Sequence, residues 1–154
     1  MSTKTKWIVI VLSVLLVIAA AVFFSWLHVD GAELTLPESQ GITGYVSRLD
    51  IGLDEQTGTA THDTINFDMT DAQVADFLQL LRNSSFRRTR YGNSVSFDGE
   101  TAYAISLSYR EENKTEIRMI SVLDNELINV GVEFGYLRIT DSDFLVKLQA
   151  ILEN

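Results

Sequence analysis

The sequence predicts an α+β fold, in which an N-terminal transmembrane helix is followed by an antiparallel sheet of five or six strands with two amphipathic helices packed on it. Three observations support this prediction. Residues 7–27 contain no charge, no Pro and no Gly. Several later segments alternate apolar with polar residues, as half-buried strands do. Two other segments repeat apolar residues at helical spacing, which indicates helices that cover one face of a sheet.

Residues 7–27 predict a helix that crosses a lipid bilayer. Only Ser13 and Ser25 in this run are not apolar. At a rise of 1.5 Å per residue, the helix would reach about 31 Å, which is close to the thickness of the hydrocarbon core. Trp7 and Trp26 lie near its ends, where indole rings prefer the headgroup layer.

The charges beside this run predict its orientation. Lys4 and Lys6 precede it, and no Lys or Arg follows it until Arg48. The positive-inside rule therefore places residues 1–6 in the cytoplasm as a short tail and the C-terminal part outside the cell membrane. A cleaved signal peptide is the alternative, because the alanines at 19–21 offer small residues at a cleavage spacing.

The remainder of the chain is expected to form one acidic extracytoplasmic domain. Residues 28–41 include the only Pro and show no sustained periodicity, which predicts a linker before a domain at 42–154. Residues 28–154 hold 10 of the 12 Lys and Arg residues and all 21 Asp and Glu residues, a net charge of −11. So acidic a surface argues against nucleic acid and against anionic lipid headgroups as general partners. The absence of Cys excludes disulfides and thiol chemistry.

The first half of the domain combines strands with one clearly marked helix. Residues 42–53 read as a strand, 54–63 as a polar loop, and 65–69 as a half-buried strand with strict alternation. Thr70 and Gln73 then form a capping box, in which each side chain satisfies a backbone N–H at the start of a helix over 70–83.

The second half predicts a meander of antiparallel strands and a final helix. The expected elements are strands at 86–91, 101–109, 115–123 and 126–134, a short edge segment at 136–139, and a helix that begins at Thr140. Ile117 and Met119 share one parity, whereas Ile120 and Val122 share the other. This change of parity predicts a bulge, or burial on both faces, near Met119.

The sequence contains no recognisable catalytic constellation. His28 falls at the membrane interface, and His62 lies in a polar loop with no second His to complete a metal pair. Asp50, Asp54 and Glu55 flank a glycine but lack the ligand spacing of an EF-hand. No nucleophile motif, phosphate loop or dinucleotide fingerprint occurs. We therefore predict no catalytic residue, no cofactor and no metal.

One basic cluster departs from the acidic background. Arg87, Arg88 and Arg90 are bracketed by Phe86 and Tyr91. On a strand, Arg88 and Arg90 would share a face with Phe86, and Arg87 would pair with Tyr91. Guanidinium groups placed in this way can hold a phosphate or carboxylate bidentately. Arg87, Arg88, Arg90 and Tyr91 are accordingly the predicted partner-binding residues, although pairing with nearby Asp and Glu would explain the arginines as well.

The layout resembles small membrane-anchored, lipoprotein-like extracytoplasmic domains of unknown function in Gram-positive bacteria. The segments that carry this resemblance are LPES at 36–39, the stretch from 70 to 90, and the region from 103 to 148. The chain lacks the lipid-carrying Cys that many such proteins have. The resemblance implies a protein of the bacterial cell envelope and transfers no catalytic residue.

These features together predict a single-pass membrane protein whose outer domain is a non-enzymatic binding or accessory module of the bacterial cell envelope. Its partners would be the lipid bilayer, through residues 7–27, and another envelope protein, but no nucleic acid. The alternative is a carboxylate-dependent hydrolase of envelope glycans, which needs two acidic side chains converging in a cleft. A third hypothesis is an accessory subunit whose alanines at 19–21 allow close helix contact within the membrane.

Overall fold

The computed structural model describes residues 3–36, 41–53, 57, 59–89, 100–112, 114–131 and 133–153, and the side chains from Trp7 onward. The described elements are, in chain order, α1 (Thr3–Leu27), β1 (His28–Asp30), α2 (Gly31–Leu34), β2 (Thr43–Leu53), β3 (Ala60–Met69), α3 (Asp71–Asn83), β4 (Ser85–Arg88), β5 (Thr101–Glu111), β6 (Lys114–Leu123), β7 (Leu127–Asn129), β8 (Tyr136–Ile139) and α4 (Phe144–Glu153).

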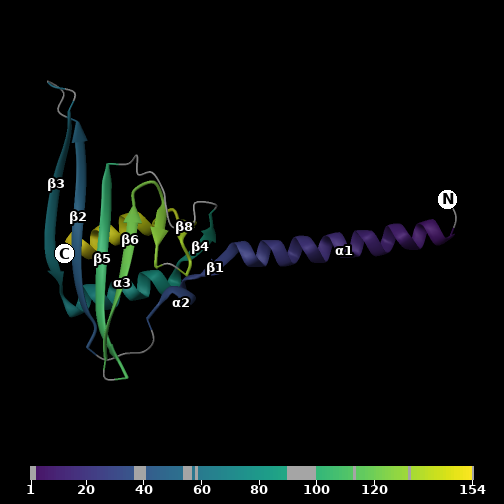
Figure 1. Ribbon diagram of the computed structural model, residues 1–154, viewed down its shortest axis with the longest axis horizontal. Helices are drawn as coiled ribbons and strands as arrows, with labels where there is room; N and C mark the ends of the chain where they lie inside the picture. Colours follow the sequence, from purple (N-terminus) through teal and green to yellow (C-terminus); the bar gives the residue numbers. More distant parts are fainter. Residues whose placement is uncertain are drawn as a thin grey trace.

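In this described part, eight strands form one sheet in the order β1-β4-β8-β7-β6-β5-β2-β3, with all neighbours antiparallel. Helix α1 extends away from the β1 edge, and β3 lies farthest from it (Figure 1). The α+β prediction is confirmed, but the predicted number of five or six strands is too low. The excess arises because the three-residue strand β1 lies in the predicted linker, and because the expected edge segment at 136–139 is a full strand, β8, that pairs on both sides. A segment as short as β1 has too few residues for alternation to identify it.

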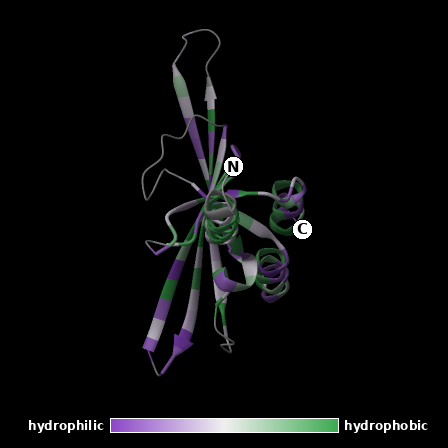
Figure 2. Ribbon diagram, turned by 90° about the vertical axis from the view of Figure 1, so that its right-hand side faces the viewer, coloured by the Kyte–Doolittle hydropathy of each residue, from purple (hydrophilic) through white to green (hydrophobic). Residues whose placement is uncertain are grey.

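Helices α3 and α4 pack side by side on one face of the sheet (Figure 2). The capping box at the start of α3 is confirmed, because Gln73 N–H donates to Thr70 Oγ1 at 3.2 Å and Thr70 N–H donates to Gln73 Oε1 at 2.9 Å. The Gln73 side chain also donates to the Ile151 carbonyl at 3.0 Å, which ties α3 to α4. Helix α4 begins at Phe144 instead of Thr140, because the Thr140 hydroxyl donates to the Ser85 carbonyl on β4 instead of capping the helix.

The core lies between this face of the sheet and the two helices. Val46, Ile105 and Ile120 are register partners across β2, β5 and β6, and all three are buried. They belong to a single cluster with apolar residues of α3, α4, β4 and β8, including Val74, Phe77, Phe86, Leu137, Phe144 and Leu148.

Residues 28–36 belong to this core, whereas the sequence predicted a linker there. Strand β1 pairs with β4, and Val29, Leu34 and Leu36 are 1%, 0% and 5% exposed. Arg118 donates from Nη1 to the Leu34 carbonyl at 3.2 Å and holds the segment after α2 against β6. Because β1 starts directly after α1, residues 28–36 attach the apolar helix to the sheet without a spacer. Residues 37–40 of the predicted linker lie outside the described residues.

Strand β6 pairs with β5 in continuous register from Lys114 to Leu123, so the bulge predicted near Met119 is wrong. Burial on both faces is also wrong, because Ile117 and Met119 are 67% and 61% exposed. The change of parity marks instead an apolar pair that points away from α3 and α4. The predicted strand over 126–134 is reduced to β7, which is preceded by a turn at 124–126.

Candidate functional site

The basic strand β4 lies next to the end of α1. Its register partners in β1 are His28 for Arg87 and Val29 for Phe86. The Phe86 ring is completely buried and packs edge-to-face on Phe144, with the ring centroids 5.9 Å apart. Since successive side chains of a strand point to opposite faces, burial of Phe86 turns Arg87 outward. Figure 1 shows β1 and β4 at the edge of the sheet from which α1 departs.

Arg88 joins the sheet to the last turn of α1. Its Nε donates to the Trp26 carbonyl at 3.2 Å, and its guanidinium lies 5.5 Å from the Trp26 ring centroid and 5.8 Å from that of Phe134. The last four carbonyls of a helix have no partner within the helix and carry a partial negative charge, so a cation there is stabilising. Stacking on two rings adds a cation–π attraction. Arg88 therefore orients α1 relative to the sheet.

Arg87 is exposed and has no ion pair among the described residues, whereas its neighbour Arg138 has one. Arg138 is the register partner of Arg87 on β8, and its Nη1 lies 3.6 Å from Glu126 Oε2. A pocket of about 180 Å³ beside Arg87 is lined by Phe24, Leu27, His28, Phe86, Arg87 and Thr140. The pocket thus lies between the end of the apolar helix and the basic strand.

Of the four predicted site residues, the structure describes two. It places Arg87 and Arg88 at the junction with α1, and Arg90 and Tyr91 lie outside the described residues. The pairing predicted between Arg87 and Tyr91 thus stays a prediction. Sequence reasoning missed Arg138, because nothing in the short segment 136–139 indicates that β8 pairs with β4. Sequence reasoning also missed that the backbone carbonyl of Trp26 accepts a hydrogen bond from Arg88.

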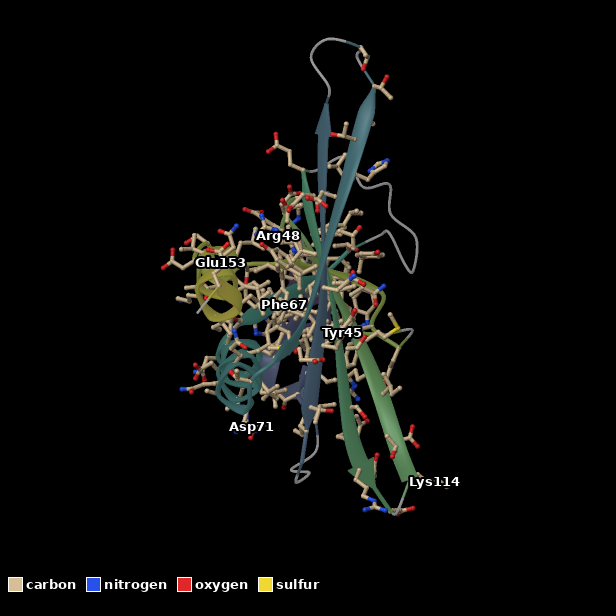
Figure 3. All side chains as sticks on the ribbon, turned by 90° about the vertical axis from the view of Figure 1, so that its left-hand side faces the viewer. Tyr45, Arg48, Phe67, Asp71, Lys114 and Glu153 are labelled. Atoms are coloured by element: carbon tan, nitrogen blue, oxygen red, sulfur yellow. The ribbon has the colours of Figure 1, made fainter. Side chains whose placement is uncertain are left out.

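A second polar site lies where β2 and β5 meet the end of α4. Arg48 Nε donates to Asp50 Oδ1 at 2.9 Å, and Nη1 lies 3.4 Å from Glu153 Oε1 (Figure 3). The hydrogen bond to Asp50 is the main reason that the pKa of Arg48 is raised above its ordinary value. Arg48 and Tyr103 line a pocket of about 180 Å³ whose other walls are Ile65, Phe67, Leu152 and Glu153.

The face of the sheet opposite α3 and α4 carries exposed apolar side chains. Figure 3 shows Tyr45 on the other side of the sheet from Phe67. Ile117 and Met119 of β6 occupy this face and line a groove of about 410 Å³, together with Tyr109, Arg118, Val130, Gly131, Glu133 and Phe134. Among the described residues, β6 pairs with β7 only over 121–123, so the edge of β6 from 114 to 120 has no strand beside it. Exposed apolar side chains at an unpaired strand edge are typical of a protein-binding surface.

The acidic residues do not converge on a metal site in the described part of the chain. Within these residues, no group of three or more His, Asp or Glu side chains could hold a metal ion. Asp50 bonds to Arg48 and to the Thr101 hydroxyl, while Asp54 and Glu55 lie outside the described residues. A groove of about 400 Å³ between α3 and α4 includes Asp76 and Asp141, but Asp141 is 3.5 Å from Lys147 Nζ.

No protein-family model, no curated protein and no solved structure matches this chain. The resemblance to lipoprotein-like envelope domains therefore stays a prediction.

Proposed function

We propose that the protein is a single-pass membrane protein whose acidic domain is a non-enzymatic binding or accessory module on the outer surface of a bacterial cell membrane. The observation that carries this proposal is that none of the apolar segment Trp7–Leu27 is buried within the chain, although it is long and apolar enough to cross a bilayer. Each large apolar side chain left in water costs about 1.5–3 kcal/mol. The segment therefore needs a lipid environment.

The attachment of α1 supports a role close to the membrane surface. Helix α1 passes directly into β1, and Arg88 contacts the Trp26 carbonyl and ring. A paired strand and a cation at the helix end restrict rotation far more than a free linker of fourteen residues would. The domain is thereby presented to other membrane components in one orientation.

Binding is favoured over catalysis by the surface opposite the helices. The exposed side chains of Ile117 and Met119, beside an unpaired strand edge, provide an apolar contact surface for an envelope protein. The hydrolase alternative requires two acidic side chains facing each other across a concave site. In the groove that contains Asp76 and Asp141, one of the two carboxylates is already paired with Lys147.

Single-cysteine labelling in intact cells tests the anchor and its orientation, since the chain has no Cys of its own. We expect Ser142→Cys, at an exposed position before α4, to react with a membrane-impermeant maleimide. Thr3→Cys should react only after the membrane is permeabilised, and both variants should stay in the membrane pellet after alkaline extraction. Release of a soluble domain would indicate a cleaved signal sequence, and the opposite labelling pattern would overturn the orientation.

The same labelling experiment tests the binding role. Met119→Cys should react more slowly in cells than in the purified full chain, because a partner covers the apolar face. Ser142→Cys serves as the control and should react equally in both settings. Equal reactivity of Met119→Cys in both settings would argue against a partner on this face.

A further inference from the structure

The end of α1 places the basic strand within the headgroup layer of the membrane. Strand β1 begins at His28, directly after the apolar run, and β4 is the next strand. Neighbouring strands lie about 4.8 Å apart. Each headgroup layer of a bilayer is about 5–8 Å thick beyond the hydrocarbon. Because successive strands lie farther from α1 along its axis (Figure 1), β4 falls inside this layer and β8 at its outer boundary.

Two arginines lie at this edge, although the domain as a whole is acidic. Arg87 is exposed without an ion pair among the described residues, and Arg88 uses one of its five N–H donors for Trp26. The domain carries a net charge of −11, which an anionic bilayer would repel at long range. The two arginines thus lie at the edge of the sheet that faces the phosphates of the headgroups.

We propose that Arg87 binds the phosphate group of a phospholipid headgroup, with a preference for anionic phosphatidylglycerol over zwitterionic phosphatidylcholine, while Arg88, on the opposite face of β4, holds the end of α1 in place. Guanidinium groups match the geometry of phosphate oxygens. The pocket beside Arg87 has Phe24 and Leu27 as apolar walls, so it receives the glycerol and upper acyl region, while Arg87 contacts the phosphate. This inference depends on the proposed membrane anchor and adds the ligand that fixes the sheet on the bilayer.

Electron paramagnetic resonance with spin-labelled lipids tests the site on the full chain in phosphatidylcholine vesicles. The measured quantity is the association constant of spin-labelled phosphatidylglycerol relative to that of spin-labelled phosphatidylcholine. We expect a ratio above one for the natural sequence. A single charge contact at a membrane surface contributes about 1 kcal/mol, so this ratio should be about five, and Arg87→Gln should lower it to near one. Arg88→Lys keeps the charge and lies outside the pocket, so it should lower the ratio less.

Arg110→Gln provides the matched control, since Arg110 is an exposed arginine of β5 near the hairpin tip, away from α1. It removes the same charge and should leave the ratio unchanged. An equal loss in Arg87→Gln and Arg110→Gln would overturn the site and indicate only net charge. An unchanged ratio in Arg87→Gln would overturn it as well. Inhibition by inorganic phosphate beyond that by chloride at equal ionic strength would indicate a free-phosphate site and would overturn the assignment to lipid.

Alkaline extraction of the same vesicles separates failure of this inference from failure of the anchor. Retention of Arg87→Gln in the vesicle pellet with an unchanged lipid ratio would remove the lipid site and leave the membrane anchor in place. Loss of the natural chain from the pellet would remove the anchor itself, and the lipid site with it.

Discussion

Tyr103 carries a buried hydroxyl group that has no hydrogen-bond partner among the described residues. The side chain is 5% exposed, and the Arg48 guanidinium lies 5.9 Å from its ring centroid. A buried hydroxyl group without a partner costs about 1–3 kcal/mol, because it loses its hydrogen bonds to water. Packing and the cation thus hold the ring in place, although its hydroxyl group loses its hydrogen bonds to water.

Replacement of Tyr103 by Phe should therefore stabilise the domain. We expect the free energy of unfolding of Tyr103→Phe to rise by about 1 kcal/mol, because the ring and its contact with Arg48 are kept and the buried oxygen is removed. Urea unfolding of the full chain in non-ionic detergent, followed by circular dichroism, measures this change. Tyr109→Phe, on the same strand and also buried, is the control and should change little. A loss of stability in Tyr103→Phe would show that its hydroxyl group is hydrogen-bonded in solution.

At the scale of elements, the shortest ones carry the attachment of α1. Strand β1 has three residues and α2 has four, yet together they contribute Val29 and Leu34 to the core. Asp30 caps α2 by accepting from the Ala32 N–H at 3.0 Å. Gly31 N–H donates to the Ser84 carbonyl at 2.9 Å, which brings the two backbones into direct contact. Only a residue without a side chain allows α2 to approach the end of α3 this closely.

Gly31→Ala should consequently disrupt the contact between α2 and α3. A Cβ atom at this position would overlap the backbone carbonyl oxygens of Leu81 and Ser84, which cannot move as a side chain can. We expect a loss of about 3 kcal/mol in the free energy of unfolding, at the upper end of overpacking effects. Thermal unfolding of the full chain in detergent gives the measurement.

Gly41→Ala separates this clash from an effect of backbone conformation. Gly41 has φ +74° and open space around its Cβ position, so Ala there should cost only about 1 kcal/mol from the left-handed conformation. Losses of equal size for Gly31→Ala and Gly41→Ala would contradict the proposed close approach of α2 to α3.

At the scale of the whole molecule, the sheet is attached to the apolar helix by the strand at its own edge. The order of the strands places β1 and β4 at one edge and β3 at the other, and the core continues from α3 and α4 to β1. The folded unit accordingly begins at residue 28, directly after α1, and not at residue 42. No spacer therefore separates the folded domain from the apolar helix.

Two shortened chains test this boundary. Residues 28–154 should fold in solution, whereas residues 42–154 should not. Loss of Val29, Leu34 and Leu36 removes about 5–9 kcal/mol of apolar burial, which is comparable to the whole stability of a typical domain. Heteronuclear NMR spectra of both chains measure the outcome. Well-dispersed spectra from residues 42–154 would contradict the role of β1 and α2 in the core.

The sequence by itself determined the features that neighbouring residues encode. The apolar run of α1, the capping box of α3 and the alternation in β5 are local patterns, and all three are present in the structure. The alternation in β5 matches its burial, because Tyr103, Ile105 and Leu107 share one face and are buried. Such patterns succeed because helical and strand periodicity depend on residues only two to four positions apart.

Only the tertiary structure decided which strands are neighbours, and therefore which residues form the candidate site. His28, Arg87 and Arg138 lie on adjacent strands although they are up to 110 positions apart in the chain. The pairing of β1 turned an expected linker into part of the core, and it brought Arg88 to the end of α1. A three-residue strand has no pattern of its own, because its stability comes from the buried partner across the sheet. Strand order depends on long-range packing of the apolar faces, which no local pattern in the sequence records.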